Sequence, residues 1–342
     1  MKKLLNVLYV LTENSYISKE GETICVHVGG EEKVRVPVHT IESIICFGNT
    51  TVSTPLLAFC GEKGIGLSFF SEYGKFYGRL EGAVRGNVLL RRAQYMAIDN
   101  QDVQRAMARG FIASKIANCR NVLMRAARDY INDETTVALS QAADELAITA
   151  RSVRNETDIE KIRGLEGIAA NKYFGVFDHL IRVNKDEFYF HERSRRPPMD
   201  NMNAILSFLY ALLTNDVRSA LEGVGLDPAA GFLHALRPGR PSLALDLMEE
   251  FRSPLVDRLS LSLVNLKQLT SNDFKQTVTG VSLTDNAKRV IITSWQKRKK
   301  EEILHPYLGE KVSIGLLPHI QALLLARYIR GDIDAYPHFY WK

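Results

Sequence analysis

The feature of this 342-residue chain that most constrains its fold is a change of residue pattern after residue 81. Before that point, β-branched and apolar runs such as Thr23–Val28 and Ile44–Phe47 are bounded by turn formers, among them Gly29-Gly30. Short runs of this kind predict strands. From about Asn87 onward, apolar residues recur at helical spacing instead. The sequence therefore predicts an α+β fold, with strands in its first part and helices in its second.

The length of the chain favours two domains rather than one. In the first part, Ser53-Thr54-Pro55 predicts the start of a short helix, and residues 65–70 and 76–80 predict a hairpin. We expect a small N-terminal β-sheet domain over residues 1–81. A linker over 82–87 and a larger all-α domain over 88–342 follow.

Positive charge is concentrated in the second part. Residues 1–81 hold 8 basic and 9 acidic side chains, so the remaining 36 basic and 30 acidic residues carry the whole excess of the net charge of +5. Nine basic residues against two acids lie between Arg85 and Arg128, and further groups lie at 191–196 and 296–300. Arginine binds phosphate bidentately, which favours a nucleic-acid ligand. The alternative is a solvated helix face.

The four cysteines form no CxxC pair, which predicts reduced, mostly buried thiols rather than disulfides or a zinc site. The longest uncharged run, Asn201 to Asn215, is shorter than the ~20 residues that a membrane span needs. We therefore expect a soluble cytoplasmic protein that does not enter a membrane.

Nucleotide-binding glycine loops and a GxSxG nucleophile motif are absent from the sequence, which leaves acids and one histidine as candidates for chemistry. Glu166 is the first. At helical spacing it shares an apolar face with Ile162, Tyr173 and Phe177. A buried carboxylate requires a cation or a hydrogen-bond donor. Alternatively, Glu166 lies at the edge of the face and pairs with Arg163 or Lys172.

A second cluster contains His234, Asp246 and Glu249. His234 precedes a loop with two prolines, and a helix is predicted to begin near Ser242 as its N-cap. Asp246 and Glu249, three residues apart on that helix, project to one side. An imidazole and carboxylates from separate elements suit Mn²⁺ or Mg²⁺ better than zinc. The alternative is that the acids only complement the helix dipole.

Three separated segments of the chain resemble motifs of one known family. Leu165–Ala170 is similar to the glutamate motif of the CRISPR-associated adaptation integrase and endonuclease family, the universal spacer-acquisition proteins. Gly231–His234 resembles its histidine motif, and Leu245–Glu249 its acidic motif. The resemblance extends over essentially the whole chain. It implies that the β-sheet domain of residues 1–81 serves dimerisation and assembly and that the helical domain of residues 88–342 is catalytic and binds DNA.

The resemblance implies roles for six residues. Glu166, His234 and Glu249 match the three metal ligands, with Mn²⁺ or Mg²⁺ as the ion. Asp246 matches an auxiliary acid near the metal, and Tyr210 matches a tyrosine beside the active site. Arg252 stands where the family has a basic residue near the scissile phosphate. Glu250 is a second acid beside Glu249, and the three-residue spacing from Asp246 favours Glu249 as the ligand.

The function implied is that of a metal-dependent DNA endonuclease and integrase of antiviral defence. The 3′ hydroxyl of a foreign DNA fragment attacks a repeat phosphodiester of a CRISPR array during spacer acquisition. The implied partners are double-stranded and branched DNA, a second copy of the chain in a homodimer, and the second, small dimeric CRISPR adaptation protein. The alternative is a non-catalytic DNA-binding scaffold of the adaptation complex.

Overall fold

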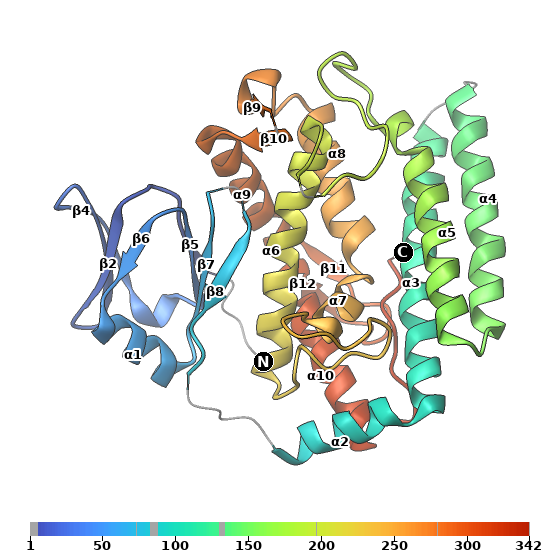
Figure 1. Cartoon of the computed structure of the whole chain (residues 1–342), viewed down its shortest axis with the longest axis horizontal. Coiled ribbons are helices and arrows are strands. Elements are labelled where there is room, and N and C mark those ends of the chain that lie inside the picture. The colour runs from blue at the N-terminus through green and yellow to red at the C-terminus, as the bar shows by residue number, and fades with distance from the viewer. Residues whose placement is uncertain are drawn as a thin grey trace. The chain divides into compact units, whose positions relative to one another are not determined.

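The computed structural model describes residues 6–72, 74–82, 88–129, 134–195, 197–278 and 280–341. The chain divides into two compact units, shown in Figure 1. The first comprises Met1–Arg85 and Gln296–Lys300, and the second comprises Gly86–Trp295 and Glu301–Lys342. Strands dominate the first unit and helices the second, which confirms the predicted fold class. Of the predicted linker, residues 83–87 lie outside the described part.

Two four-stranded sheets make up the first unit. One has the order β4-β3-β2-β6 and contains β2 (Ser15–Glu20), β3 (Thr23–Val28), β4 (Glu31–Pro37) and β6 (Thr50–Val52). The other has the order β1-β5-β7-β8 and contains β1 (Val7–Val10), β5 (Ser43–Phe47), β7 (Gly66–Phe70) and β8 (Phe76–Arg79). The 3₁₀ turn η1 (Val38–Thr40) precedes β5, and α1 (Thr54–Lys63) follows β6. The predicted hairpin corresponds to β7 and β8.

Apolar side chains of both sheets form one core. Ile24 of β3, Ile44 of β5 and Leu67 of β7 are almost completely buried, and Leu56 of α1 belongs to the same cluster. Gly29 and Gly30 join β3 to β4, and both have positive φ, as a type I′ turn requires. The first unit thus buries apolar surface between two sheets that tight turns hold in register.

Long helices form most of the second unit (Figure 1). They are α2 (Val88–Asp99), α3 (Gln101–Asp129), α4 (Glu134–Asn155), α5 (Ile159–Gly175), α6 (Asn201–Gly223), α7 (Ser242–Met248), α8 (Arg258–Asn265), α9 (Asp285–Lys300) and α10 (Leu317–Arg330). Short turns are η2 (Phe177–Leu180), the π-helical η3 (Arg252–Asp257), η4 (Ser271–Asp273) and η5 (Ile314–Leu316). Helices α3, α4 and α5 lie side by side, and α6 is buried along most of its length.

Two short strand pairs also belong to the second unit, which is therefore mostly rather than wholly helical. They are β9 (Phe274–Thr277) with β10 (Gly280–Leu283), and β11 (Glu302–Leu304) with β12 (Lys311–Ser313). Strands of three or four residues are too short to show a clear alternating pattern, so the residue pattern did not predict them.

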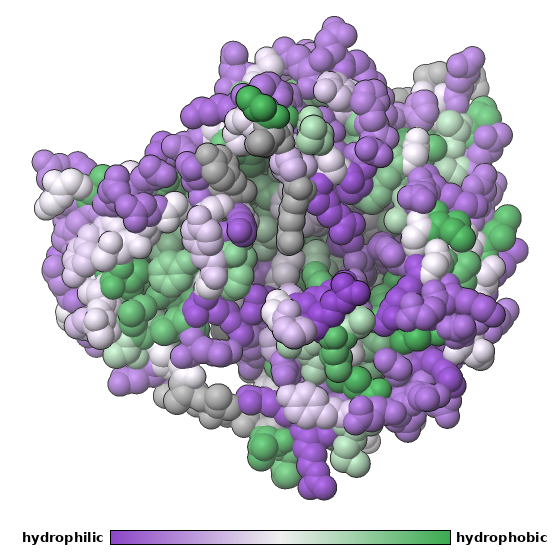
Figure 2. Space-filling view, in the orientation of Figure 1, coloured by the Kyte–Doolittle hydropathy of each residue, from purple (hydrophilic) through white to green (hydrophobic). Residues whose placement is uncertain are grey.

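The surface and the cysteines agree with the composition. None of the helices in the described ranges is long and apolar enough to cross a membrane. On the face drawn in Figure 2, hydrophilic side chains predominate and hydrophobic ones form separate patches. All four cysteines are free and buried, as predicted.

We expect Ile44→Ala to destabilise the first unit by about 2–5 kcal/mol, because Ile44 is completely buried on a central strand and its truncation leaves a cavity. Val34→Ala on the exposed strand β4 is the control and should change the free energy of unfolding by no more than about 0.5 kcal/mol. Urea denaturation followed by circular dichroism measures both. Equal effects of the two substitutions would contradict the assignment of the core.

Candidate active site

Two carboxylates from distant parts of the second unit meet at one buried cation. Glu166 lies on α5, Glu249 directly follows α7, and Lys115 lies on α3. The Lys115 ammonium contacts Glu166 Oε1 and lies 2.8 Å from Glu249 Oε2. Lys115 and Glu249 are buried, whereas the Glu166 side chain is 32% exposed. Glu166 therefore links a buried charge cluster to solvent.

The expected cation beside Glu166 is present, but both candidates named for it are wrong. Arg163 binds Glu160 and the carbonyl oxygen of Leu233, and Lys172 lies 2.9 Å from Glu145. Lys115 is the partner, although the sequence analysis counted it among the phosphate-binding basic residues. The two residues are 51 positions apart, so helical spacing gives no sign of their contact.

Arg252 binds the other oxygen of Glu249. Its guanidinium lies 2.7 Å from Glu249 Oε1, so cations face both oxygens of this carboxylate. Burial alone would raise the pKa of Glu249, but the charges of Arg252 and Lys115 outweigh it and hold the pKa at about 2. Glu249 is therefore a buried carboxylate that stays ionised.

The ring of Tyr210 on α6 packs against the guanidinium of Arg252. The Arg252 guanidinium is 4.4 Å from the centre of the Tyr210 ring, and the Tyr210 hydroxyl donates to Asp257 Oδ1. Tyr173 donates to Asp257 Oδ2 at 3.1 Å. Burial raises the pKa of Asp257 despite these hydrogen bonds. The Tyr210 hydroxyl is thus occupied by Asp257, while its ring packs against the Arg252 guanidinium.

Asp246 holds the segment that carries His234. Its carboxylate is completely buried and accepts the backbone N–H groups of Phe232, Leu233 and His234 at 2.6–3.0 Å. The same carboxylate lies 2.6 Å from His234 Nδ1. A carboxylate acceptor at Nδ1 places the ring proton of the neutral imidazole there and leaves the lone pair on Nε2. Asp246 therefore orients His234.

The close approach of the His234 segment to helix α7 depends on Gly231. A Cβ atom at this position would lie 2.7 Å from Asp246 Oδ2 and 2.8 Å from the backbone nitrogen of Leu243. Ser242, predicted as the N-cap, is instead the first residue of α7 and donates to the carbonyl oxygen of Ala235. The first turn of α7 contains no acid, so the helix-dipole alternative for these acids is wrong.

Glu250 faces away from Glu249, toward the C-terminal segment 336–341. It is completely buried and accepts from Tyr336, His338 and the backbone N–H of Phe339 at 2.8–3.2 Å. Asn118 of α3 donates to the carbonyl oxygens of both Glu250 and Phe339. These contacts dock the aromatic C-terminal segment against α3 and Glu250. Since Glu250 is fully occupied there, Glu249 is the acid that faces Glu166.

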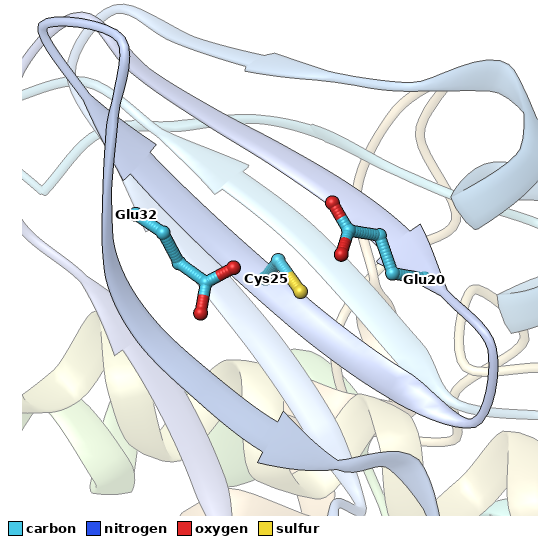
Figure 3. A group of neighbouring side chains, drawn as sticks. All are labelled: Glu20, Cys25 and Glu32. Atoms are coloured by element: carbon cyan, nitrogen blue, oxygen red, sulfur yellow. The ribbon is translucent and has the colours of Figure 1, made fainter.

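Among the residues that the structure describes, one group of three has potential ligand atoms within 4.8 Å of one another, namely Glu20, Cys25 and Glu32 in the first unit (Figure 3). Arg35 lies 2.6 Å from Glu20 and 2.5 Å from Glu32, so both carboxylates of this group are already ion-paired. The ligand atoms of Glu166, His234 and Glu249 are spaced more widely, and the Lys115 ammonium contacts both glutamates.

The predicted basic stretches are only partly available to a ligand. Arg92, Arg125 and Arg128 are exposed. In contrast, Arg193 donates to Asn203 and Ser207 and so ties its loop to α6. Arg85 and Arg196 lie outside the described residues.

A family model described as CRISPR associated protein Cas1 matches residues 8–297. The chain belongs to the Cas1 family. Along its whole length it is 51% identical to the CRISPR-associated endonuclease Cas1 1 of Chlorobaculum tepidum, all of which is covered. The match confirms the resemblance seen in the three motifs and the predicted enzyme class, a CRISPR-associated nuclease. An endonuclease of the Cas1 family implies a requirement for a divalent metal.

Solved structures share the fold. A CAS1 protein from Thermotoga maritima has a TM-score of 0.83 and 25% identity, with 96% of this chain and 97% of that chain covered. A casposase bound to integration product has a TM-score of 0.82 at 21% identity, with 98% of this chain and 94% of that chain covered. A chain of a Cas6-RT-Cas1–Cas2 complex has a TM-score of 0.85 at 20% identity. The match covers 100% of this chain and 36% of that chain.

We expect Glu250→Ala to destabilise the second unit by about 3 kcal/mol or more, because its removal leaves several buried donors without an acceptor. Glu145→Ala, which removes a 53% exposed partner of Lys172, is the control and should cost at most about 1 kcal/mol. Thermal and urea unfolding measure the difference. A Glu250→Ala variant as stable as the control would show that the docked C-terminal segment does not depend on this carboxylate.

Proposed function

We propose that this Cas1 protein is a metal-dependent DNA endonuclease and integrase that inserts foreign DNA fragments into a CRISPR array. In this reaction the 3′ hydroxyl of the incoming fragment attacks a phosphodiester of the repeat. The observation that carries the proposal is the convergence of Glu166 and Glu249 on one cation, in the unit that also holds His234 ready through Asp246. Membership in the Cas1 family supports it.

The residues present fit a hard divalent ion, for which we propose Mn²⁺ or Mg²⁺. Glu166 and Glu249 supply carboxylate oxygens that already share a cation, and His234 supplies the lone pair of Nε2. Oxygen ligands with one imidazole suit Mn²⁺ and Mg²⁺, whereas structural zinc sites favour thiolates. We assign Glu166, His234 and Glu249 as the three ligands.

When bound, the ion polarises the phosphodiester and stabilises the charge that develops during in-line displacement. The protein residues position the reactants around it. Asp246 keeps His234 in one tautomer and orientation, and Tyr210 and Asp257 hold Arg252 against Glu249. The Arg252 side chain is only 13% exposed. Desolvation alone would lower its pKa, but Glu249 outweighs this and raises the pKa, so Arg252 supplies a permanent positive charge close to the scissile phosphate. The attacking hydroxyl belongs to DNA, so the reaction needs no protein nucleophile.

Double-stranded and branched DNA are the proposed substrates. The exposed Arg92, Arg125 and Arg128 of α2 and α3 would contact backbone phosphates, so binding should weaken as salt rises. We further propose that the first unit mediates a homodimer and that the dimer assembles with the second CRISPR adaptation protein. The solved complex of a related fold that includes Cas1 and Cas2 supports this part of the proposal.

We expect His234→Ala to lose at least about 100-fold of its activity in joining a 3′-hydroxyl DNA fragment to a repeat-containing duplex with Mn²⁺, because one ligand of the ion is lost. His39→Ala, at an exposed histidine of the first unit, is the matched control and should keep the activity of the unchanged protein. A gel assay of strand joining measures both variants. Activity that survives both EDTA and His234→Ala would contradict the proposed metal site.

A further inference from the structure

We infer that Lys115 is the built-in counter-cation of the active site and that it competes with the divalent ion for Glu166 and Glu249. The inference rests on the proposed function, because it takes these two glutamates as metal ligands. It assigns to a helix α3 lysine a role that the three family motifs do not contain, since Lys115 lies outside all of them.

Among the described residues, Lys115 is the cation that contacts both glutamates. Its ammonium contacts both Glu166 and Glu249, whereas Arg252 contacts Glu249 through the opposite oxygen, Oε1. Lys115 is therefore the cation that bridges the two glutamates. Its side chain is only 9% exposed, so water screens these charges weakly.

Electrostatics explains why the site holds a lysine at this point. Two carboxylates brought together in a buried place repel each other, and one of them would turn away unless a cation were present. The Lys115 ammonium supplies that cation and keeps both carboxylates facing each other. The lysine thus keeps the two carboxylates close together in the absence of a divalent ion.

The same contact opposes metal binding. A divalent ion held by Glu166 and Glu249 would lie beside the oxygens that the ammonium contacts, and two positive charges at one pair of carboxylates repel each other. Each cation therefore weakens the binding of the other to Glu166 and Glu249. In the absence of metal, a neutral side chain of the same length at this position should leave Glu166 without its cation and Glu249 with Arg252 alone, and it should allow tighter metal binding.

The test compares Mn²⁺ affinity by isothermal titration calorimetry in the unchanged protein, Lys115→Met and Lys288→Met. Lys288 is the matched control, because it is also a buried, ion-paired lysine of the second unit but contacts Asp285. We expect Lys115→Met to lower the dissociation constant for Mn²⁺ about tenfold. We also expect Lys115→Met to have a lower melting temperature in EDTA than the other two proteins. Added Mn²⁺ should raise its melting temperature by more than it raises theirs. Lys288→Met should match the unchanged protein in Mn²⁺ affinity.

Equal or weaker Mn²⁺ binding by folded Lys115→Met would overturn the inference while leaving the proposed function intact. If the unchanged protein bound Mn²⁺ no better than His234→Ala, the proposed metal site and this inference would both fail. A second measurement covers the case in which Lys115→Met does not fold. In the unchanged protein, Mn²⁺ should increase the rate of reductive methylation of Lys115, read by mass spectrometry, and leave Lys288 unaffected. No increase at Lys115 would also overturn the inference.

Discussion

The balance of charge around Glu249 is the constraint on which the rest of the active site depends. This carboxylate is buried, and an unpaired buried charge costs several kcal/mol, so the fold must bring cations to it. Lys115 comes from α3 and Arg252 from η3, and each faces one oxygen. Arg252 in turn requires support, which Tyr210 and Asp257 provide. The packing of α3, α6 and η3 in this region follows from the need to compensate one acid.

Two buried acids, Asp246 and Glu250, hold the chain around the C-terminal end of α7. Asp246 holds the loop that carries His234, and Glu250 holds the C-terminal segment against α3. Glu249 lies between Asp246 and Glu250 in sequence, and its side chain faces Glu166 and Lys115. A π-helical turn follows at once, and such turns are frequent at functional sites. Asp246 and Glu250 thus hold the segments on either side, and Glu249 between them is the carboxylate that faces Glu166.

Residue patterns were sufficient for the parts of the structure that local sequence determines. Strands with β-branched residues and turns with glycine were predictable, as were the long helices, and the three motifs identified Glu166, His234 and Glu249 as candidates. The contact of Lys115 with two glutamates was not predictable, because it joins helices far apart in sequence. Likewise, the three-residue spacing from Asp246 favoured Glu249 over Glu250 but could not show what each acid binds, since their partners are an α3 lysine for one and the C-terminal segment for the other.

Anomalous diffraction from crystals grown with Mn²⁺ tests the central claim most directly, because it locates the ion without reference to activity. The account predicts one strong anomalous peak in contact with carboxylate oxygens of Glu166 and Glu249 and with His234 Nε2, and a Lys115 ammonium that has moved away from the carboxylates. A peak at Glu20, Cys25 and Glu32 instead, or a second unit without any peak, would contradict the account.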